Sequence, residues 1–266
     1  MKSIRFIARV DDAGSSHAAN LAIGRAIKAG FIKNVSLMAP GPFIKEAAQM
    51  FAGDKKVCFG MHGTLNAEWD RMKWKPVLPA KRCDGLLDDQ GYFLADPVLF
   101  DRSRPSVETA LAELSAQLDR LTRLGFNVSY LDSHMFAEAH IPGLDEAIAA
   151  FAVRKGLIDH MYYYRLPPGM AQIGEDWSGF LRHLPGGQYF YVAHPAVYGA
   201  EMLRTGNATY RGIDIARGRG REAKLLGNPL LAPATRILYG VRTLRYDQAR
   251  PLSRRLTVAE LGRILS

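Results

Sequence analysis

Short apolar, β-branched runs alternate along most of the chain with segments of helical periodicity. The run IRFIARV at residues 4–10 predicts a buried strand, and similar runs predict strands at 35–38, 57–61, 128–131 and 188–193. Apolar residues at helical spacing predict helices over 17–29, 43–51, 107–124 and 144–153, with weaker patterns at 221–226 and 258–265. The segment 84–94 predicts a small hairpin that turns at Asp89-Gln90-Gly91. This alternation indicates βα units and a mainly parallel sheet.

The strands are continuously apolar, which suits a sheet covered on both faces, so both an open doubly wound sheet and a (β/α) barrel fit. With 266 residues, 48% hydrophobic and 23% charged, we expect a single α/β domain over residues 1–266. No apolar run approaches about 18 residues, which excludes a spanning helix. The first apolar stretch is too short for a signal peptide, and the only cysteines are Cys58 and Cys83. We therefore expect a cytoplasmic protein.

The net charge of +9 is concentrated at the C-terminal end. Residues 1–200 hold 22 Lys and Arg against 21 Asp and Glu, whereas residues 201–266 hold 13 against 5, a net charge of +8. Such a basic segment is either a solvated face or a surface for an anionic partner. No nucleic-acid-binding motif accompanies it, so we expect no nucleic acid partner.

Four predicted strands end in residues that bind metals or move protons. These residues are Asp11-Asp12, His62, Asp132-Ser133-His134 and His194. In parallel α/β folds, loops at the carboxyl edge of the sheet meet, so groups distant in sequence converge on one pocket. A helix N-cap ahead of Ser15-Ser16 would explain the aspartates, but it does not account for the histidines.

One Asp and two His residues form a sound three-ligand site for a divalent cation, with positions left open for water and substrate. The second aspartate can then take a proton from the attacking water, and His194 can protonate a leaving group. Adjacent residues on a regular strand face opposite ways, so only a distorted strand end places both Asp11 and Asp12 in one pocket. Asp132 is expected to orient a histidine ligand.

Several motifs in order over roughly residues 1–200 resemble the YdjC-like carbohydrate deacetylases, which include chitooligosaccharide deacetylase and the hopanoid-biosynthesis deacetylase. The matching segments are RVDDAGSSHAANLAIGRAIKAGFIKNVSLMAP, FGMHGTLNAEWD, KPVLP, LLDDQGYF, SYLDSHM and VAHPAVYG. The basic C-terminal quarter matches only loosely.

The resemblance implies a distorted TIM-like (β/α) barrel of the polysaccharide-deacetylase type. It also implies a metal-dependent hydrolase that splits the linear amide C–N bond of an acetylated amino sugar. Carried over by residue, Asp12, His62 and His134 would bind Mg²⁺ or Zn²⁺, Asp11 would be the general base and His194 the general acid. The two aspartates could exchange roles.

Substrate contacts are expected from residues near the pocket rim and from aromatic faces. The candidates are Asn66, Trp69, Tyr198 and, from charge alone, Arg221. The sequence leaves open which acetylated sugar or glycolipid is used and whether the chain forms a homo-oligomer.

Two other functions remain open at this point. One is an iron enzyme with a two-His-one-carboxylate site, which would leave the second aspartate without a role. The other is a non-catalytic module that binds an anionic glycan, lipid or nucleic acid through its Arg-rich C-terminal region.

Overall fold

The computed structural model describes residues 2–168 and 177–265. Seven parallel strands form one sheet in the order β5-β4-β3-β2-β1-β6, and β7 also pairs with β1. The strands are β1 (Ile4–Ala13), β2 (Asn34–Leu37), β3 (Cys58–Gly63), β4 (Val128–Ser133), β5 (Ile158–Asp159), β6 (Gly187–Ala193) and β7 (Val241–Leu244). The sheet is curled, and within the described ranges no ladder joins β5 to β6. The result is an open, distorted TIM-like (β/α) barrel, the architecture that the sequence resemblance implied.

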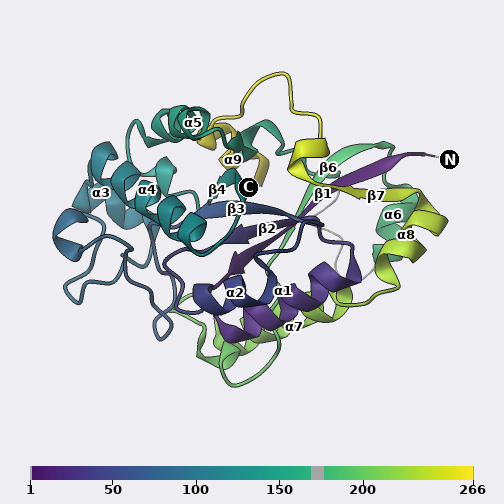
Figure 1. The fold of residues 1–266 in the computed structure, drawn as a ribbon, viewed down its shortest axis with the longest axis horizontal. Helices are drawn as coiled ribbons and strands as arrows, with labels where there is room; N and C mark the ends of the chain where they lie inside the picture. The colour runs from purple at the N-terminus through teal and green to yellow at the C-terminus, as the bar shows by residue number, and fades with distance from the viewer. Residues whose placement is uncertain (1, 169–176, 266) are drawn as a thin grey trace.

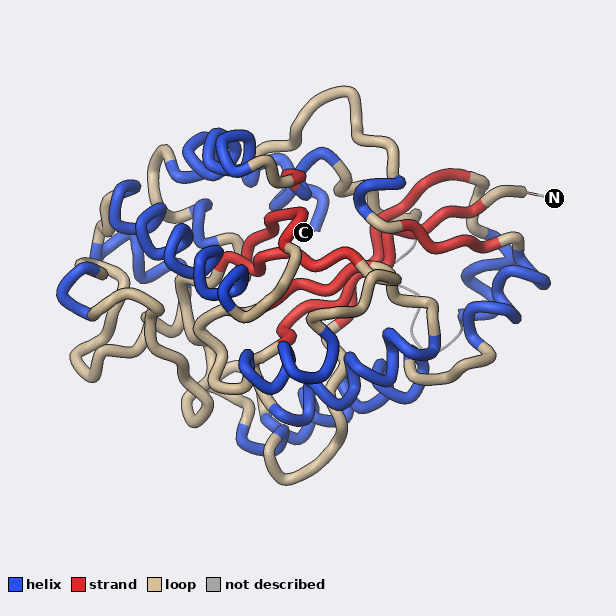
Figure 2. The backbone as a smooth tube through the Cα atoms, viewed as in Figure 1, coloured by secondary structure: helices blue, strands red, loops and turns tan. Residues whose placement is uncertain are grey.

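Helices cover the outside of this sheet (Figures 1 and 2). One group of helices lies along one side of the sheet and consists of α1, α2 and α7. A second pair, α4 and α5, packs together on another part of the sheet. The helices are α1 (His17–Ala29), α2 (Ile44–Phe51), α3 (Phe100–Ser103), α4 (Val107–Arg123), α5 (Leu144–Lys155), α6 (Trp177–His183), α7 (Gly212–Leu226), α8 (Leu231–Tyr239) and α9 (Val258–Leu265). None of the described helices combines the length and the apolar composition that crossing a bilayer requires.

Strand β1 organises the molecule because it is long and has neighbours on both edges. β6 runs beside Ile4–Val10, whereas the other edge is shared by β7 over the first half and β2 over the second. Phe6, Ala8 and Val10 pack into the large core beneath the helices. The alternate positions Ile7, Arg9 and Asp11 are buried on the opposite, inner face, as the two-residue repeat of a strand requires.

A second apolar cluster fills the inner face below the carboxyl edge. Its large members are aromatic and come from strands and loops throughout the chain: Tyr130, Tyr164, Phe190 and Tyr246. Ser36 and Tyr130 share a hydrogen bond of 2.9 Å between their hydroxyls across this face. The cluster forms an apolar floor beneath the chemical groups at the strand ends.

The expected elements match closely, and the differences are of two kinds: shifted bounds and elements that were not predicted. α1 and α9 have the predicted bounds, and β1, β3 and β4 continue past the predicted ends into the chemical motifs. The expected small hairpin at 84–94 is present in a short form: an antiparallel bridge joins Leu87 to Phe93, and backbone hydrogen bonds join Leu94 to Leu86 and Asp88 to Tyr92. The Asp88 carboxylate also accepts hydrogen bonds from the backbone N–H groups of Gln90 and Tyr92, which stabilises the turn. Five elements had no predicted counterpart, namely β5, β7, α3, α6 and α8, and α7 begins well before residue 221.

Candidate active site

The end of β1 is distorted where the two aspartates lie. The ladder between β1 and β2 shifts register between Val10 and Ala13, and Asp12 has a positive φ of 66°. This left-handed conformation costs a residue other than glycine about 1–2 kcal/mol, and aspartate is among the side chains that tolerate it best. The distortion turns Asp12 to the same pocket as Asp11, which a regular strand would not do.

Asp12, His62 and His134 meet at this point from three different strand ends. The Asp12 Oδ1 atom lies 3.7 Å from His62 Nε2 and 3.8 Å from His134 Nδ1, and the two ring nitrogens are 3.1 Å apart. All three side chains are buried, with at most 5% of any residue exposed. Each residue therefore offers one ligand atom within 4.8 Å of the other two.

A carboxylate holds the far nitrogen of each histidine. His62 Nδ1 lies 2.6 Å from Asp132 Oδ2, and His134 Nε2 lies 2.9 Å from Glu68 Oε2. Because a carboxylate only accepts, these ring nitrogens carry hydrogen, and the opposite nitrogens are directed toward Asp12. Metal-binding histidines are commonly oriented in this way.

The donor set fits a divalent cation. Asp12 Oδ2 accepts a hydrogen bond of 2.7 Å from Arg219, whereas the buried Oδ1 has no hydrogen-bond partner in the part of the chain that the structure describes. That oxygen and the two imidazole nitrogens face one another, a combination that suits zinc or another transition metal. A second trio of Asp11, His62 and Asp132 is equally close, but Arg9 already pairs with both of its carboxylates.

The carboxylates around His62 favour a proton on its ring. Burial lowers the pKa of His62, but the carboxylates of Asp132, Asp11 and Asp12 outweigh burial and raise it to about 9. The protonated ring donates through Nδ1 to Asp132 and through Nε2 to His134 Nδ1. Burial also opposes ionisation of Asp12, yet Arg219 and the nearby histidines hold its pKa well below the usual range. A cation would thus take the place of the His62 proton.

Arg9 is the cationic partner of the second aspartate. Its Nε lies 2.7 Å from Asp11 Oδ1, and one terminal nitrogen lies 2.8 Å from Asp11 Oδ2 and 3.2 Å from Asp132 Oδ2. The guanidinium stacks over the Phe190 ring at 4.8 Å and is almost fully buried. Arg9 therefore fixes the Asp11 carboxylate beside the candidate metal ligands and neutralises part of its charge.

His194 lies at the mouth of the pocket. Its Nε2 is 3.9 Å from Asp11 Oδ2, and 42% of its side chain is exposed. The backbone N–H of His194 donates to Glu222 Oε2 at 2.8 Å, which links the end of β6 to α7. These groups surround a cavity of about 320 Å³ whose walls also include Trp69, Phe136 and Tyr210.

The other expected substrate residues do not line this cavity. Asn66 is buried, with its amide nitrogen 3.0 Å from Met135 Sδ, and the exposed Tyr198 lies off the cavity wall. Arg221 is exposed on α7, whereas Arg219 faces the site. Ala216, Arg219, Ala223 and Leu226 recur at helical spacing on the inward side of α7, so residue 221 falls on the outer side.

Four residues of the site were absent from the sequence predictions: Arg9, Glu68, Arg219 and Glu222. The strand repeat offered a signal for Arg9, because it lies two residues before Asp11 and must share its face. The helical phase of α7 offered one for Arg219 and Glu222. Glu68 follows β3 in irregular chain, where no periodicity fixes its direction.

The model of the YdjC-like protein family matches residues 5–177, about two thirds of the chain. The chain belongs to the YdjC-like family. The match includes Asp11, Asp12, His62 and His134 but ends before His194 and Arg219, so the C-terminal part of the pocket lies outside it.

Proteins named carbohydrate deacetylase are similar to this chain. One from Thermoanaerobacter pseudethanolicus is 29% identical over 147 residues, which is 53% of this chain and 54% of the relative. Relatives from Vibrio cholerae and Mus musculus are 27% and 29% identical, covering 52% and 57% of this chain and 51% and 49% of their own lengths. The matches span about half the length of these relatives.

A solved structure from Enterococcus faecalis supports the fold. This protein, provisionally named a cellobiose-phosphate cleavage protein, superposes with a TM-score of 0.72 over 92% of this chain and 98% of its own. At 19% sequence identity, the similarity establishes the architecture alone.

Proposed function

We propose that this protein is a metal-dependent hydrolase that removes an acetyl group from an N-acetylated sugar or glycoconjugate. The observation that carries the proposal is the convergence of Asp12, His62 and His134, each histidine backed by a carboxylate, in one cavity with Asp11 and His194. The carbohydrate deacetylases among its relatives supply the reaction class.

When bound, a divalent cation lowers the pKa of water and polarises a carbonyl oxygen. Asp12, His62 and His134 would hold it, with Zn²⁺ and Mg²⁺ as the candidates. Arg219 binds the other Asp12 oxygen and so restricts this ligand to one orientation. Asp132 and Glu68 restrict the two rings in the same way.

Asp11 takes the proton from the water that attacks the acetamide carbonyl. Arg9 contacts both oxygens of this carboxylate and keeps it beside the ligand set as its charge changes. His194 lies next to Asp11 at the open side of the cavity, where it can donate a proton to the departing amine. Acetate and the free amino sugar are the products.

The cavity limits what can enter. About 320 Å³ is at the lower end of the range for small-molecule sites, so it accommodates one sugar unit with its acetamido group. Trp69 and Tyr210 on the wall supply flat faces on which a sugar ring can pack.

An acetate-release screen tests this function. N-acetylglucosamine, its oligomers and N-acetylated glycolipids are incubated with the full chain, with chelator and after restoration of Zn²⁺ or Mg²⁺. We expect release that chelator abolishes and one metal restores. Absence of acetate release from every substrate with every metal would overturn the proposal.

A pair of matched variants separates catalysis from metal binding. Asp11→Asn should lower the rate of acetate release by about 10²–10⁴-fold while bound metal stays at the wild-type level. Asp119→Asn, which removes an exposed carboxylate of α4, should leave both unchanged. Wild-type turnover in Asp11→Asn would exclude this residue as the base.

A further inference from the structure

Helix α8 presents apolar side chains to solvent, the reverse of an ordinary surface helix. Leu230, just before the helix, is 68% exposed, and Ile237 and Leu238 are 68% and 65% exposed. Pro233 and Ala234 are also exposed and lie between them at helical spacing. The outward side of α8 is therefore a continuous apolar strip.

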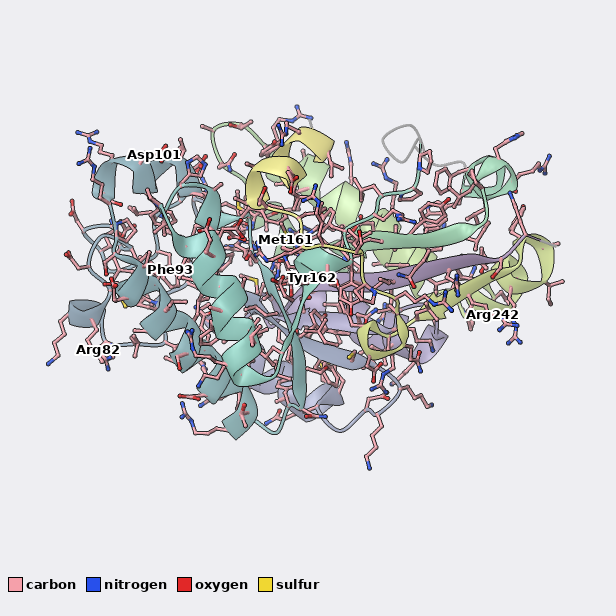
Figure 3. All side chains as sticks on the ribbon, turned by 90° about the horizontal axis from the view of Figure 1, so that it is seen from above. Arg82, Phe93, Asp101, Met161, Tyr162 and Arg242 are labelled. Atoms are coloured by element: carbon pink, nitrogen blue, oxygen red, sulfur yellow. The ribbon has the colours of Figure 1, made fainter. Side chains whose placement is uncertain are left out.

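Cationic side chains border this strip on both sides. One hollow beside α8, of about 640 Å³, is lined in part by Lys33, Arg236 and Arg242. Another, of about 410 Å³, is lined by Lys2, Arg182, Leu238 and Tyr239. No carboxylate lines either hollow among the described residues, and residues 223–246 contain no Asp or Glu at all. Figure 3 places Arg242 at this end of the molecule.

We propose that α8 is a docking surface for an anionic lipid membrane. Leu230, Ile237 and Leu238 would enter the boundary between headgroups and acyl chains, while the bordering Lys and Arg residues pair with lipid phosphates. Two such faces brought together would place cations against cations, which disfavours a second copy of this chain as the occupant. A polyanion such as nucleic acid would use the cations but leave the apolar strip without a partner.

The docking surface and the candidate active site lie at opposite ends of β1. β7, which follows α8 directly, pairs with Ile4–Ile7 at the start of β1, whereas Asp11 and Asp12 lie at its other end. From Ile4 to Asp12 the strand advances roughly 26 Å at about 3.3 Å per residue. Docking through α8 therefore leaves the catalytic cavity open, and the inference does not depend on the proposed function.

Vesicle flotation of the full chain tests the inference. Vesicles of phosphatidylcholine alone are compared with vesicles that also contain about 30% phosphatidylglycerol, at low and high salt. We expect binding to the anionic vesicles that weakens as salt rises. Ile237→Ser with Leu238→Ser should lower this binding by roughly tenfold or more. Arg236→Glu with Arg242→Glu should abolish the preference for anionic lipid.

Val153→Ser on α5 is the matched control, because Val153 is apolar and 79% exposed. It should leave vesicle binding unchanged. Circular dichroism of all variants should match the wild type, since every altered side chain is exposed. Absence of binding to anionic vesicles would overturn the inference, as would binding that the α8 substitutions do not alter. A dimer that dissociates in Ile237→Ser/Leu238→Ser without any vesicle binding would identify a second copy as the occupant instead.

Discussion

Replacement of Arg9 by methionine tests the electrostatics beneath the candidate site. The substitution keeps most of the side-chain stem but removes the charge that pairs with Asp11 and Asp132, which are 3% and 0% exposed. Removing one partner of a buried ion pair costs about 3–5 kcal/mol, because the other charge stays buried without compensation. We expect a loss of that size in the free energy of unfolding of the metal-free protein at pH 7.

The loss should depend on pH in a defined direction. Burial raises the pKa of Asp132, but Arg9 and His62 more than offset it and hold the pKa well below the usual range. A carboxyl with a lowered folded-state pKa stabilises the protein above its unfolded pKa, and this stabilisation disappears as pH falls. Without Arg9, the Asp132 carboxyl protonates more readily. The deficit of Arg9→Met should therefore be smaller at pH 5 than at pH 7.

Urea denaturation followed by circular dichroism measures both effects. Arg5→Met is the matched control, because Arg5 lies on the same strand and forms no ion pair with any described carboxylate. Arg5→Met should lower the free energy of unfolding much less than Arg9→Met does. Arg9→Met with Asp132→Asn should recover part of the loss. A change below about 1 kcal/mol in the free energy of unfolding of Arg9→Met at pH 7 would exclude Arg9 as the stabilising partner of the two buried carboxylates.

Three further predictions concern the carboxylate of Glu68, the pH dependence of metal binding and the buried acid Glu138 outside the site. Glu68→Gln should weaken metal binding by about 10–100-fold in calorimetry, since the ring of His134 loses its orienting charge, and unchanged affinity would exclude this role. The pKa of His62 is raised to about 9, and a metal binds only the neutral ring. The affinity for the metal should therefore increase by up to about tenfold per pH unit between pH 6 and 9, with release of about one proton. An affinity that does not change with pH would contradict this prediction. Burial raises the pKa of Glu138 from its usual value near 4.5 to about 7 in the folded protein. The resulting stabilisation of the folded state is fully present below pH 4.5 and is lost as pH rises through 7. Glu138→Gln should thus be more stable than wild type at pH 8 by about 3 kcal/mol and equal to it near pH 4.5, as measured by denaturation at both values.

Local periodicity explains most of what the sequence predicted. The strands β1, β3 and β4 could be located because each is a continuous apolar run, and parallel pairing then brings their ends together. His62 and Asp132 are paired directly across β3 and β4. The requirement for a distorted strand at Asp11-Asp12 also followed from the strand repeat, and the positive φ of Asp12 meets it.

The remaining site residues and helix α8 could not be predicted in this way, because no clear periodic pattern in the sequence identified them. Glu68 lies in a loop, where only tertiary contacts direct its side chain toward His134. Arg221 was selected from charge alone, whereas the phase of α7 turns Arg219 to the pocket. α8 begins in the Pro- and Leu-rich segment NPLLAP, whose exposed apolar residues obscure the usual amphipathic pattern.

Anomalous X-ray diffraction from crystals of the zinc-soaked protein would show whether Asp12, His62 and His134 bind one cation together. We expect one zinc peak about 2.0–2.2 Å from Asp12 Oδ1, His62 Nε2 and His134 Nδ1. Peaks only at other sites, or a protein that remains metal-free at saturating zinc near pH 8, would contradict this expectation.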